Sequence, residues 1–185
     1  MKMVVRVFIL LLSLVTVSAC QATTVKDETV SKEFINLFDY EIQNRAFALA
    51  SMEALVRTGD VNPNLEFFKA YLELEKLNQK KFSPVASKHQ LSVEPRWWTR
   101  TRTRLGMCMS NIMPETSLKV IHKATVKYVA QLQALEAVSP EQDKAFFAYV
   151  VAQEQAQADA VGLLLAGEPD QGTALLTQFI AENAQ

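Results

Sequence analysis

Apolar residues recur at spacings of three and four along most of the chain after residue 30, which is the pattern of amphipathic helices. The first such stretch begins after Ser31, a residue that can cap a helix, and the pattern stops at Gly59. We therefore predict one long helix over residues 31–59. Its apolar positions are Phe34, Leu37, Phe38, Ile42, Leu49, Met52, Leu55 and Val56.

Four further helices are expected from the same periodicity and from the residues that start and stop helices. Asn62-Pro63 opens the second, which has Pro84 near its end or at a kink, and Pro114 opens the third. The sequence Ser139-Pro140-Glu141-Gln142 has the residues of a capping box with proline at the first helical position, and predicts the start of a fourth helix that Gly167 ends. A short fifth helix follows Pro169 and is expected to pack across the others.

The lengths of the connections indicate how these helices are arranged. The connections between helices one and two and between helices three and four are short, so each pair is expected to form an antiparallel hairpin. The segment 83–113 is long enough to cross the bundle from end to end. The predicted fold class is all-α: a four-helix bundle with one crossover connection and a short C-terminal helix. A simple up-down bundle with an insertion is the alternative.

The composition agrees with one helical domain. The 185 residues are 49% hydrophobic and 21% charged, which is too apolar for a disordered chain. Only 5 Gly and 6 Pro are present, about half of average usage, and turn-rich β architectures need more. A formal net charge of -1 provides no basic field for nucleic acid, so we expect no nucleic-acid partner.

The N-terminal segment has the layout of an export signal. Lys2 and Arg6 precede an apolar run from Val7 to Val17, and the small residue Ala19 stands before Cys20. The apolar run has about 11 residues, whereas a membrane-spanning helix needs about 20, so an uncleaved anchor is the weaker interpretation.

The residues Val17-Ser18-Ala19-Cys20 resemble the lipobox of bacterial lipoproteins. The resemblance implies cleavage before Cys20, acylation of that cysteine and attachment to a membrane. Residues 1–19 would then be the signal peptide, 20–30 the lipidated cysteine and a flexible tether, and 31–185 the bundle domain. Gln21 is similar to the sorting residue of lipoproteins sent to the outer membrane, which implies a location there facing the periplasm. An ordinary signal peptide with a chance cysteine is the alternative.

Removal of the signal peptide changes the charge and the cysteine content of the chain. The remaining 166 residues carry 17 basic and 20 acidic residues, a formal net charge of -3. Only Cys108 remains beside Cys20, so no intrachain disulfide is expected once Cys20 is acylated. Cys108 stands in an apolar stretch and is interpreted as a small buried side chain rather than a reactive thiol.

Three glutamates stand on the apolar stripes of predicted helices. Glu41, Glu75 and Glu154 each have apolar residues three, four or seven positions away, so helical geometry turns them inward. A buried carboxylate is costly unless a cation or several hydrogen-bond donors compensate it. The sequence therefore predicts a partner for these groups in the interior.

The carboxylate pattern resembles the ferritin-like di-metal proteins, which carry a Glu on each of two helices and Glu-x-x-His on the other two. The resemblance covers most of residues 31–166 and implies a ferritin-like bundle with iron or manganese. Both histidines are replaced, however, and the third helix has Thr125 where the family has a glutamate. The matching positions are Glu41, Glu75 with Asn78, and Glu154 with Gln157, with His122 one turn from Thr125.

This incomplete ligand set favours a polar network over a metal site. At most three strong ligands remain, fewer than two metal ions normally need. Asn78 and Gln157 can donate to the carboxylates, and Arg45 or Lys127 can supply positive charge. No cofactor is expected. An altered iron or manganese site using Glu41, Glu75, His122 and Glu154 is the alternative.

The predicted crossover contains a dense group of arginines and both tryptophans. If it is helical, Arg96, Arg100 and Arg104 form one ridge, beside Trp97 and Trp98. Such a ridge suits anionic lipid head groups or an acidic envelope protein. A solvated ridge whose indoles cover the end of the core is the alternative.

Taken together, the residues predict a membrane-anchored lipoprotein whose helical domain is a binding or scaffolding module without enzymatic activity. No Ser, His and acid arrangement supports a hydrolase, and the chain has only two histidines. A metal-binding protein or metal-dependent oxidoreductase is the alternative. The sequence predicts neither the partner nor the oligomeric state.

Overall fold

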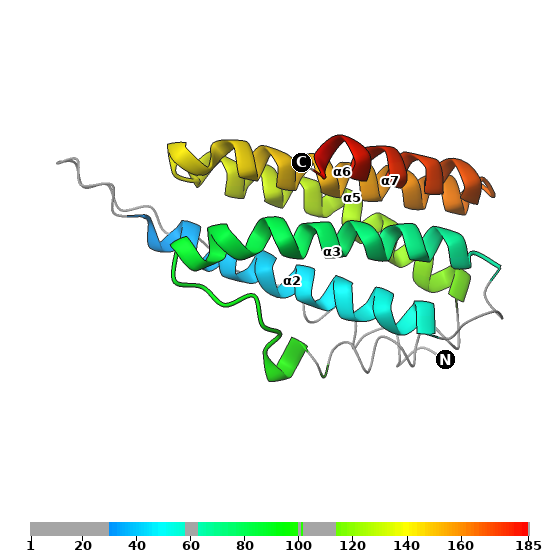
Figure 1. Ribbon diagram of the computed structural model, residues 1–185, viewed down its shortest axis with the longest axis horizontal. Helices are drawn as coiled ribbons and strands as arrows, with labels where there is room; N and C mark the ends of the chain where they lie inside the picture. Colours follow the sequence, from blue (N-terminus) through cyan, green and yellow to red (C-terminus); the bar gives the residue numbers. More distant parts are fainter. Residues whose placement is uncertain (1–29, 58–62, 100, 102–113, 185) are drawn as a thin grey trace, which may run out of the picture.

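The computed structural model describes residues 30–57, 63–99, 101 and 114–184 (Figure 1). Within these residues the regular structure is entirely helical, which confirms the all-α class. The predicted signal peptide, Cys20, Arg100, Arg104 and Cys108 lie outside the described residues. Four long helices are α2 (Lys32–Arg57), α3 (Leu65–Lys88), α5 (Pro114–Val138) and α6 (Lys144–Leu165), and a shorter one is α7 (Pro169–Asn183). A 3-10 turn, η2 (Glu141–Asp143), precedes α6.

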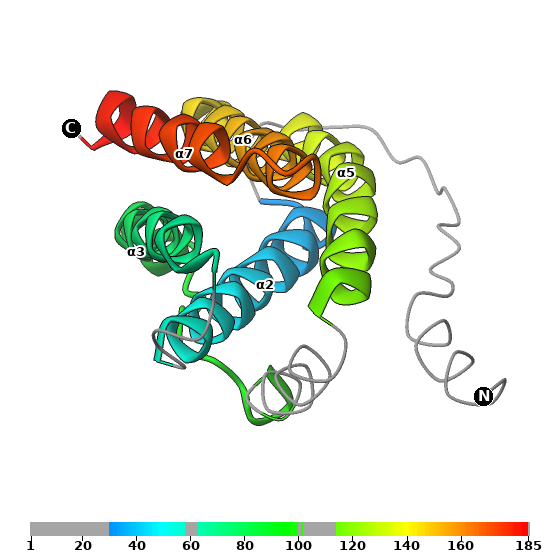
Figure 2. The same cartoon turned by 90° about the vertical axis from the view of Figure 1, so that its right-hand side faces the viewer.

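The helices form two hairpins. α2 and α3 pack side by side, as do α5 and α6, and α7 packs against both α6 and α3 (Figure 2). α3 ends and α5 begins at opposite ends of the bundle (Figure 1). The chain between them therefore joins opposite ends of the bundle, and it begins after Lys88 rather than at residue 83.

The start of α2 follows the predicted capping, whereas the start of α6 does not. Ser31 Oγ accepts a hydrogen bond from the Phe34 backbone N–H at 3.0 Å. Ser139 Oγ instead donates to the Glu136 carbonyl at 2.7 Å, so it satisfies the end of α5. The prediction of a capping box at Ser139 is therefore wrong, because its hydroxyl donates to a free carbonyl at the end of the preceding helix.

Both α3 and α6 end with a residue in the left-handed conformation. Gly167 (φ 84) follows α6, and its N–H reaches the Leu164 carbonyl at 3.1 Å. α3 does not end at Pro84 but continues to Lys88, and Gln90 takes the left-handed conformation (φ 58). The Leu91 N–H donates a hydrogen bond to the Ala86 carbonyl at 2.9 Å, at the C-terminal end of α3.

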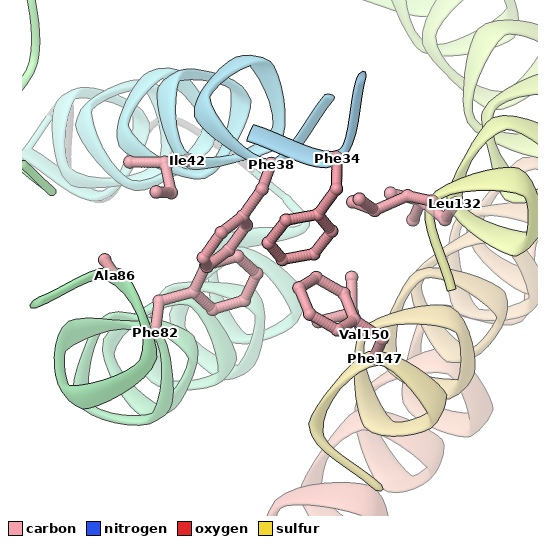
Figure 3. Close-up of a cluster of buried hydrophobic side chains, with 9 residues drawn as sticks. Phe34, Phe38, Ile42, Phe82, Ala86, Leu132, Phe147 and Val150 are labelled. Atoms are coloured by element: carbon pink, nitrogen blue, oxygen red, sulfur yellow. The ribbon is translucent and has the colours of Figure 1, made fainter. Parts of the chain in front are cut away.

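The apolar interior has two parts. The first, shown in Figure 3, brings aromatic rings from three helices together, with Phe34 and Phe147 edge-to-face at 5.3 Å between centroids. It comprises Phe34, Phe38, Ile42, Phe82, Ala86, Leu132, Leu135, Phe147 and Val150. The second lies toward the other end of the same helices and includes α7; it comprises Phe67, Phe68, Tyr71, Leu74, Ala160, Val161, Leu164 and Leu176.

α7 approaches α6 closely at Gly172. A Cβ atom at this position would lie 2.8 Å from the Ala160 carbonyl oxygen and 3.0 Å from Phe67 Cε2. Gly172 lies within α7 and lets the helix seat on α6 and α3, rather than forming part of the turn around Pro169.

Candidate functional site

Arg45 lies at the centre of a buried polar layer between the two apolar clusters. Its Nη2 atom lies 2.8 Å from Glu154 Oε2, its Nη1 atom 3.1 Å from Glu75 Oε1, and its Nε atom 3.0 Å from Glu41 Oε1. The Glu41 and Glu75 side chains are fully buried, and those of Arg45 and Glu154 are 10% and 4% exposed. The predicted inward direction of all three glutamates is therefore confirmed, and Arg45 of α2 provides the cation.

Amide side chains complete the layer around Glu75. Gln157 Nε2 donates to Glu75 Oε1 at 2.7 Å, and Asn78 Nδ2 donates to Glu75 Oε2 at 3.2 Å. Gln153 Oε1 accepts hydrogen bonds from Asn78 Nδ2 at 3.0 Å and Gln157 Nε2 at 2.9 Å. Both amides expected in the network are present, and Gln153 is a further member. The amides replace the hydration that a buried carboxylate loses.

Three tyrosines close the layer at its edges. The Tyr71 hydroxyl donates to Gln157 Oε1 at 2.9 Å, and the Tyr149 hydroxyl donates to Asn78 Oδ1 at 2.6 Å. The Tyr128 hydroxyl of α5 donates to Glu41 Oε2 and accepts from Asn44 Nδ2 at 2.6 Å. Burial raises the pKa of both the Tyr71 and Tyr128 hydroxyls, so they remain donors at neutral pH.

One contact in the layer is incomplete. Glu41 Oε1 and Arg45 Nε are both buried, and neither makes a hydrogen bond. They lie 3.0 Å apart, so the contact is an ion pair in which the Nε–H is not aimed at the oxygen. Glu41 thus receives less compensation than the other two carboxylates.

The charges of the layer do not balance, because three carboxylates share one guanidinium. Burial raises the pKa of Glu41 to about 7, against the opposing effect of Arg45, and the Glu154 and Glu75 charges add to the rise. Burial also raises the pKa of Glu75. Although burial alone would lower the pKa of Arg45, the carboxylates raise it well above its usual value. Arg45 is therefore always charged, and Glu41 titrates near neutral pH.

The residues present do not fit a ferritin-like metal site. The guanidinium of Arg45 lies among the three carboxylates whose oxygens would be the metal ligands. His122 packs instead against Gly162, where its Nε2 atom would lie 3.3 Å from an added Cβ, two turns beyond Glu154. Among the described residues, no three His, Cys, Asp or Glu side chains are placed to hold a metal ion. The alternative prediction, which grouped His122 with the three glutamates, does not agree with this position of His122.

Lys127, the other candidate for the cation, is exposed on α5. The side chain of Tyr128, the next residue, reaches Glu41 instead. The choice between Arg45 and Lys127 depends on how α5 is rotated about its axis, since adjacent helical residues differ in direction by about 100°.

The described part of the arginine and tryptophan segment is held to α2 by Gln43. Gln43 Oε1 accepts from the Arg96 backbone N–H at 3.0 Å and Thr99 Oγ1 at 2.8 Å, while Nε2 donates to the Glu94 carbonyl at 3.2 Å. The Arg96 side chain pairs with Asp39 at 2.7 Å. Trp97 is 78% exposed and Trp98 is half-buried, so the segment presents one indole to solvent.

A second buried polar group lies at the junction of α3 and α6. Asp143 pairs with Lys88 Nζ at 2.6 Å and with His89 Nε2 at 2.7 Å. Hydrogen bonds from Lys88 and His89 outweigh the effect of burial and lower the pKa of Asp143. The His89 ring also packs edge-on against Phe34, at 5.0 Å between centroids, so this group joins helix ends.

The sequence interpretation missed Gln43, Gln153 and the tyrosine hydroxyls. Gln153 stands one turn before Gln157 on the same face of α6, a spacing that could have identified it. Tyr128 and Tyr71 stand at apolar spacings of their helices, and nothing in that spacing shows which carboxylate or amide a hydroxyl reaches.

The fold and the polar layer together define an all-helical bundle with an arginine-centred interior. No family model matches the chain, and no curated protein and no solved structure is significantly similar to it. None of the described helices combines the length and hydropathy that crossing a bilayer requires.

Proposed function

We propose that this protein is a lipid-anchored lipoprotein of the cell envelope whose helical domain is a ferritin-like bundle that serves as a non-enzymatic binding or scaffolding module. The observation that carries the proposal is the position of Arg45. A permanent guanidinium among Glu41, Glu75 and Glu154 supplies the positive charge that metal ions supply in the di-metal relatives.

The amide side chains around Glu75 support the same function. Asn78 and Gln157 stand where the family carries histidines, and both are committed to hydrogen bonds within the layer. An amide is a weak ligand for iron or manganese compared with imidazole. The layer therefore serves to fix the pairing of the helices, a role that buried polar residues have in other helical assemblies.

The lipobox supports the membrane attachment. Acylation of Cys20 would place the bundle at the end of a tether of about ten residues, which spans up to roughly 35 Å. A domain on such a tether can reach a partner near the membrane surface. The sorting residue Gln21 favours the outer membrane.

The metal content of the protein tests whether the polar layer of the helical domain works without a metal ion. Protein purified without a histidine tag is analysed for iron, manganese and zinc, together with Glu75→Gln and a surface control, Glu73→Gln. We expect less than about 0.1 metal ion per chain in all three proteins. A stoichiometric metal that is lost in Glu75→Gln and kept in Glu73→Gln would overturn the proposal and favour the metal-dependent alternative.

Labelling with an alkyne fatty acid tests the anchor. The full chain should incorporate the label and accumulate as a precursor in the presence of globomycin. Cys20→Ala should incorporate no label and its processing should not respond to globomycin, while Cys108→Ser should behave as the parent. A mature chain with an unmodified N-terminus would contradict the lipoprotein assignment.

The alternative function, metal binding, retains one favourable observation, the convergence of three carboxylates from α2, α3 and α6. It requires Arg45 to leave the layer, which would break its ion pairs to all three glutamates. The cost of breaking one buried pair is about 3–5 kcal/mol, so the arrangement with Arg45 in place is favoured.

A further inference from the structure

A cavity of about 240 Å³ lies between α2 and α3, next to the polar layer. It follows one face of α2 over three turns, and Phe82, Val93 and Pro95 contribute to its walls. Small side chains create the space on α2, where Ala46 and Ala50 stand one turn apart. The remaining lining residues are Ile42, Arg45, Leu49, Glu53, Glu75 and Gln79.

The cavity has an apolar body and polar groups in fixed places. Arg45 and Glu75 are both buried, whereas Glu53 and Gln79 are exposed and mark the mouth. A mostly apolar pocket with few polar groups is the usual form of a site for a small organic ligand. A cavity of 150 Å³ accommodates benzene, so this one has room for a body of about six to eight carbons.

The charges around the cavity determine whether a cationic or an anionic ligand is favoured. The lining includes one cation, Arg45, and two carboxylates, Glu53 and Glu75. Arg45 is already shared among Glu75, Glu154 and Glu41, so none of its charge remains to attract an anion. The field in the cavity is therefore negative, and it stays negative even when Glu41 is protonated.

We propose that this cavity binds a small organic cation, a primary ammonium group on an apolar body, with the body between α2 and α3 and the ammonium group paired with Glu53 at the mouth. This inference names a ligand class for the binding module and so rests on the proposed function. A carboxylate or phosphate ligand of the same shape is repelled by the same groups.

Three probes of equal length test the proposal on the chain without its signal peptide and tether. Hexylammonium, hexanol and hexanoate are titrated into labelled protein at pH 7, and backbone amide shifts are followed by NMR. Hexylammonium should shift amides of α2 around Ala46 and Ala50. Hexanol should bind about tenfold more weakly, and hexanoate should cause no saturable shift.

Variants separate the cavity from adsorption at the surface. Ala50→Leu fills the cavity and should abolish binding, whereas the control Ala134→Leu changes an exposed alanine of α5 and should leave binding intact. Glu53→Gln should weaken hexylammonium binding several-fold and leave hexanol unaffected. Circular dichroism checks that each variant is folded, and Ala46→Val replaces Ala50→Leu if the latter is not.

Any of three results would overturn the inference. Equal affinities for hexanol and hexylammonium would mean that the carboxylates do not select the ligand. Binding that persists in the filled variant, or no saturable shift with any probe, would mean that the cavity is not the site. None of these results alters the expected acylation of Cys20 or the expected metal content, so the proposed function is tested separately.

Discussion

Arg45 joins α2 to α6 through an ion pair of 2.8 Å between its Nη2 atom and Glu154 Oε2. The same guanidinium reaches Glu75 on α3 and Glu41 one turn earlier on α2. One side chain thus connects both hairpins of the bundle, at a level where apolar packing is interrupted. The stability of the domain should depend on this residue and on pH.

Replacement of Arg45 tests its part in the fold. Arg45→Met leaves three buried carboxylates without a cation, so the free energy of unfolding should fall by about 3–5 kcal/mol. Urea denaturation at pH 7 measures this change. Arg57→Met removes an exposed arginine at the end of α2 and should change stability by less than about 0.5 kcal/mol. Equal effects of the two substitutions would contradict a central role for Arg45.

The pH dependence of stability should be unusual for a carboxylate cluster. The pKa of Glu41 is about 7 in the folded protein against an ordinary value of 4.5, so the folded state holds this proton more tightly. Stability should therefore fall as pH rises from about 4.5 to about 7, by up to about 3 kcal/mol. The raised pKa of Glu75 acts in the same direction.

The lowered pKa of Asp143 acts in the opposite direction. Asp143 contributes to the free energy of unfolding above its ordinary pKa of 3.8. This contribution is lost as the pH falls through the lower pKa that Asp143 has in the folded protein. Urea denaturation between pH 3 and 8 should therefore show maximal stability under mildly acidic conditions. Glu41→Gln should flatten the decline toward pH 7, and Glu73→Gln should keep it. A stability that rises steadily from pH 4.5 to 7 would exclude this account.

Gln43 should control the segment that carries the exposed tryptophan. Gln43→Ala removes three hydrogen bonds to residues 94–99 and should lower the free energy of unfolding by about 1–3 kcal/mol. Limited trypsin digestion should then cut after Arg96 at least several-fold faster. Gln131→Ala, on the exposed face of α5, is the matched control. Unchanged cleavage would show that other contacts hold the segment.

Gly172 should be intolerant of a side chain. Gly172→Ala places a Cβ 2.8 Å from the Ala160 carbonyl oxygen, a backbone atom that cannot move independently, and should cost about 1–3 kcal/mol. Gly162→Ala meets the His122 ring at 3.3 Å, which can shift, so its effect should stay within about 1 kcal/mol. Thermal unfolding of both variants measures the difference, and similar melting temperatures would contradict the close approach of α7.

Replacement of Gln90 by glycine should stabilise the protein. Gln90 holds a left-handed conformation (φ 58) that costs a residue with a Cβ about 1–2 kcal/mol and costs glycine nothing sterically. Gln90→Gly should therefore raise the free energy of unfolding by about 1 kcal/mol in urea denaturation. Gln90→Val should lower it, because a β-branched residue is least suited to this conformation.

The parts of the fold that depend on neighbours along the chain were predicted well. Periodicity located α2 and the short C-terminal helix, and Ser31 and Gly167 lie at helix ends as expected. The start of α6 was mispredicted because Ser139 had two possible partners, and the end of α5 took its hydroxyl. A local signal does not decide between partners on adjacent helices.

The sequence by itself determined that Glu41, Glu75 and Glu154 point inward, because helical spacing fixes which face of its own helix a residue occupies. Only the tertiary structure decided which side chains contact the three carboxylates. Arg45 lies among the three glutamates while His122 packs against Gly162, since the rotation and offset of each helix depend on packing across the whole interior. His122 thus lies about two helical turns from the level of Glu154, and this offset leaves the three glutamates to Arg45.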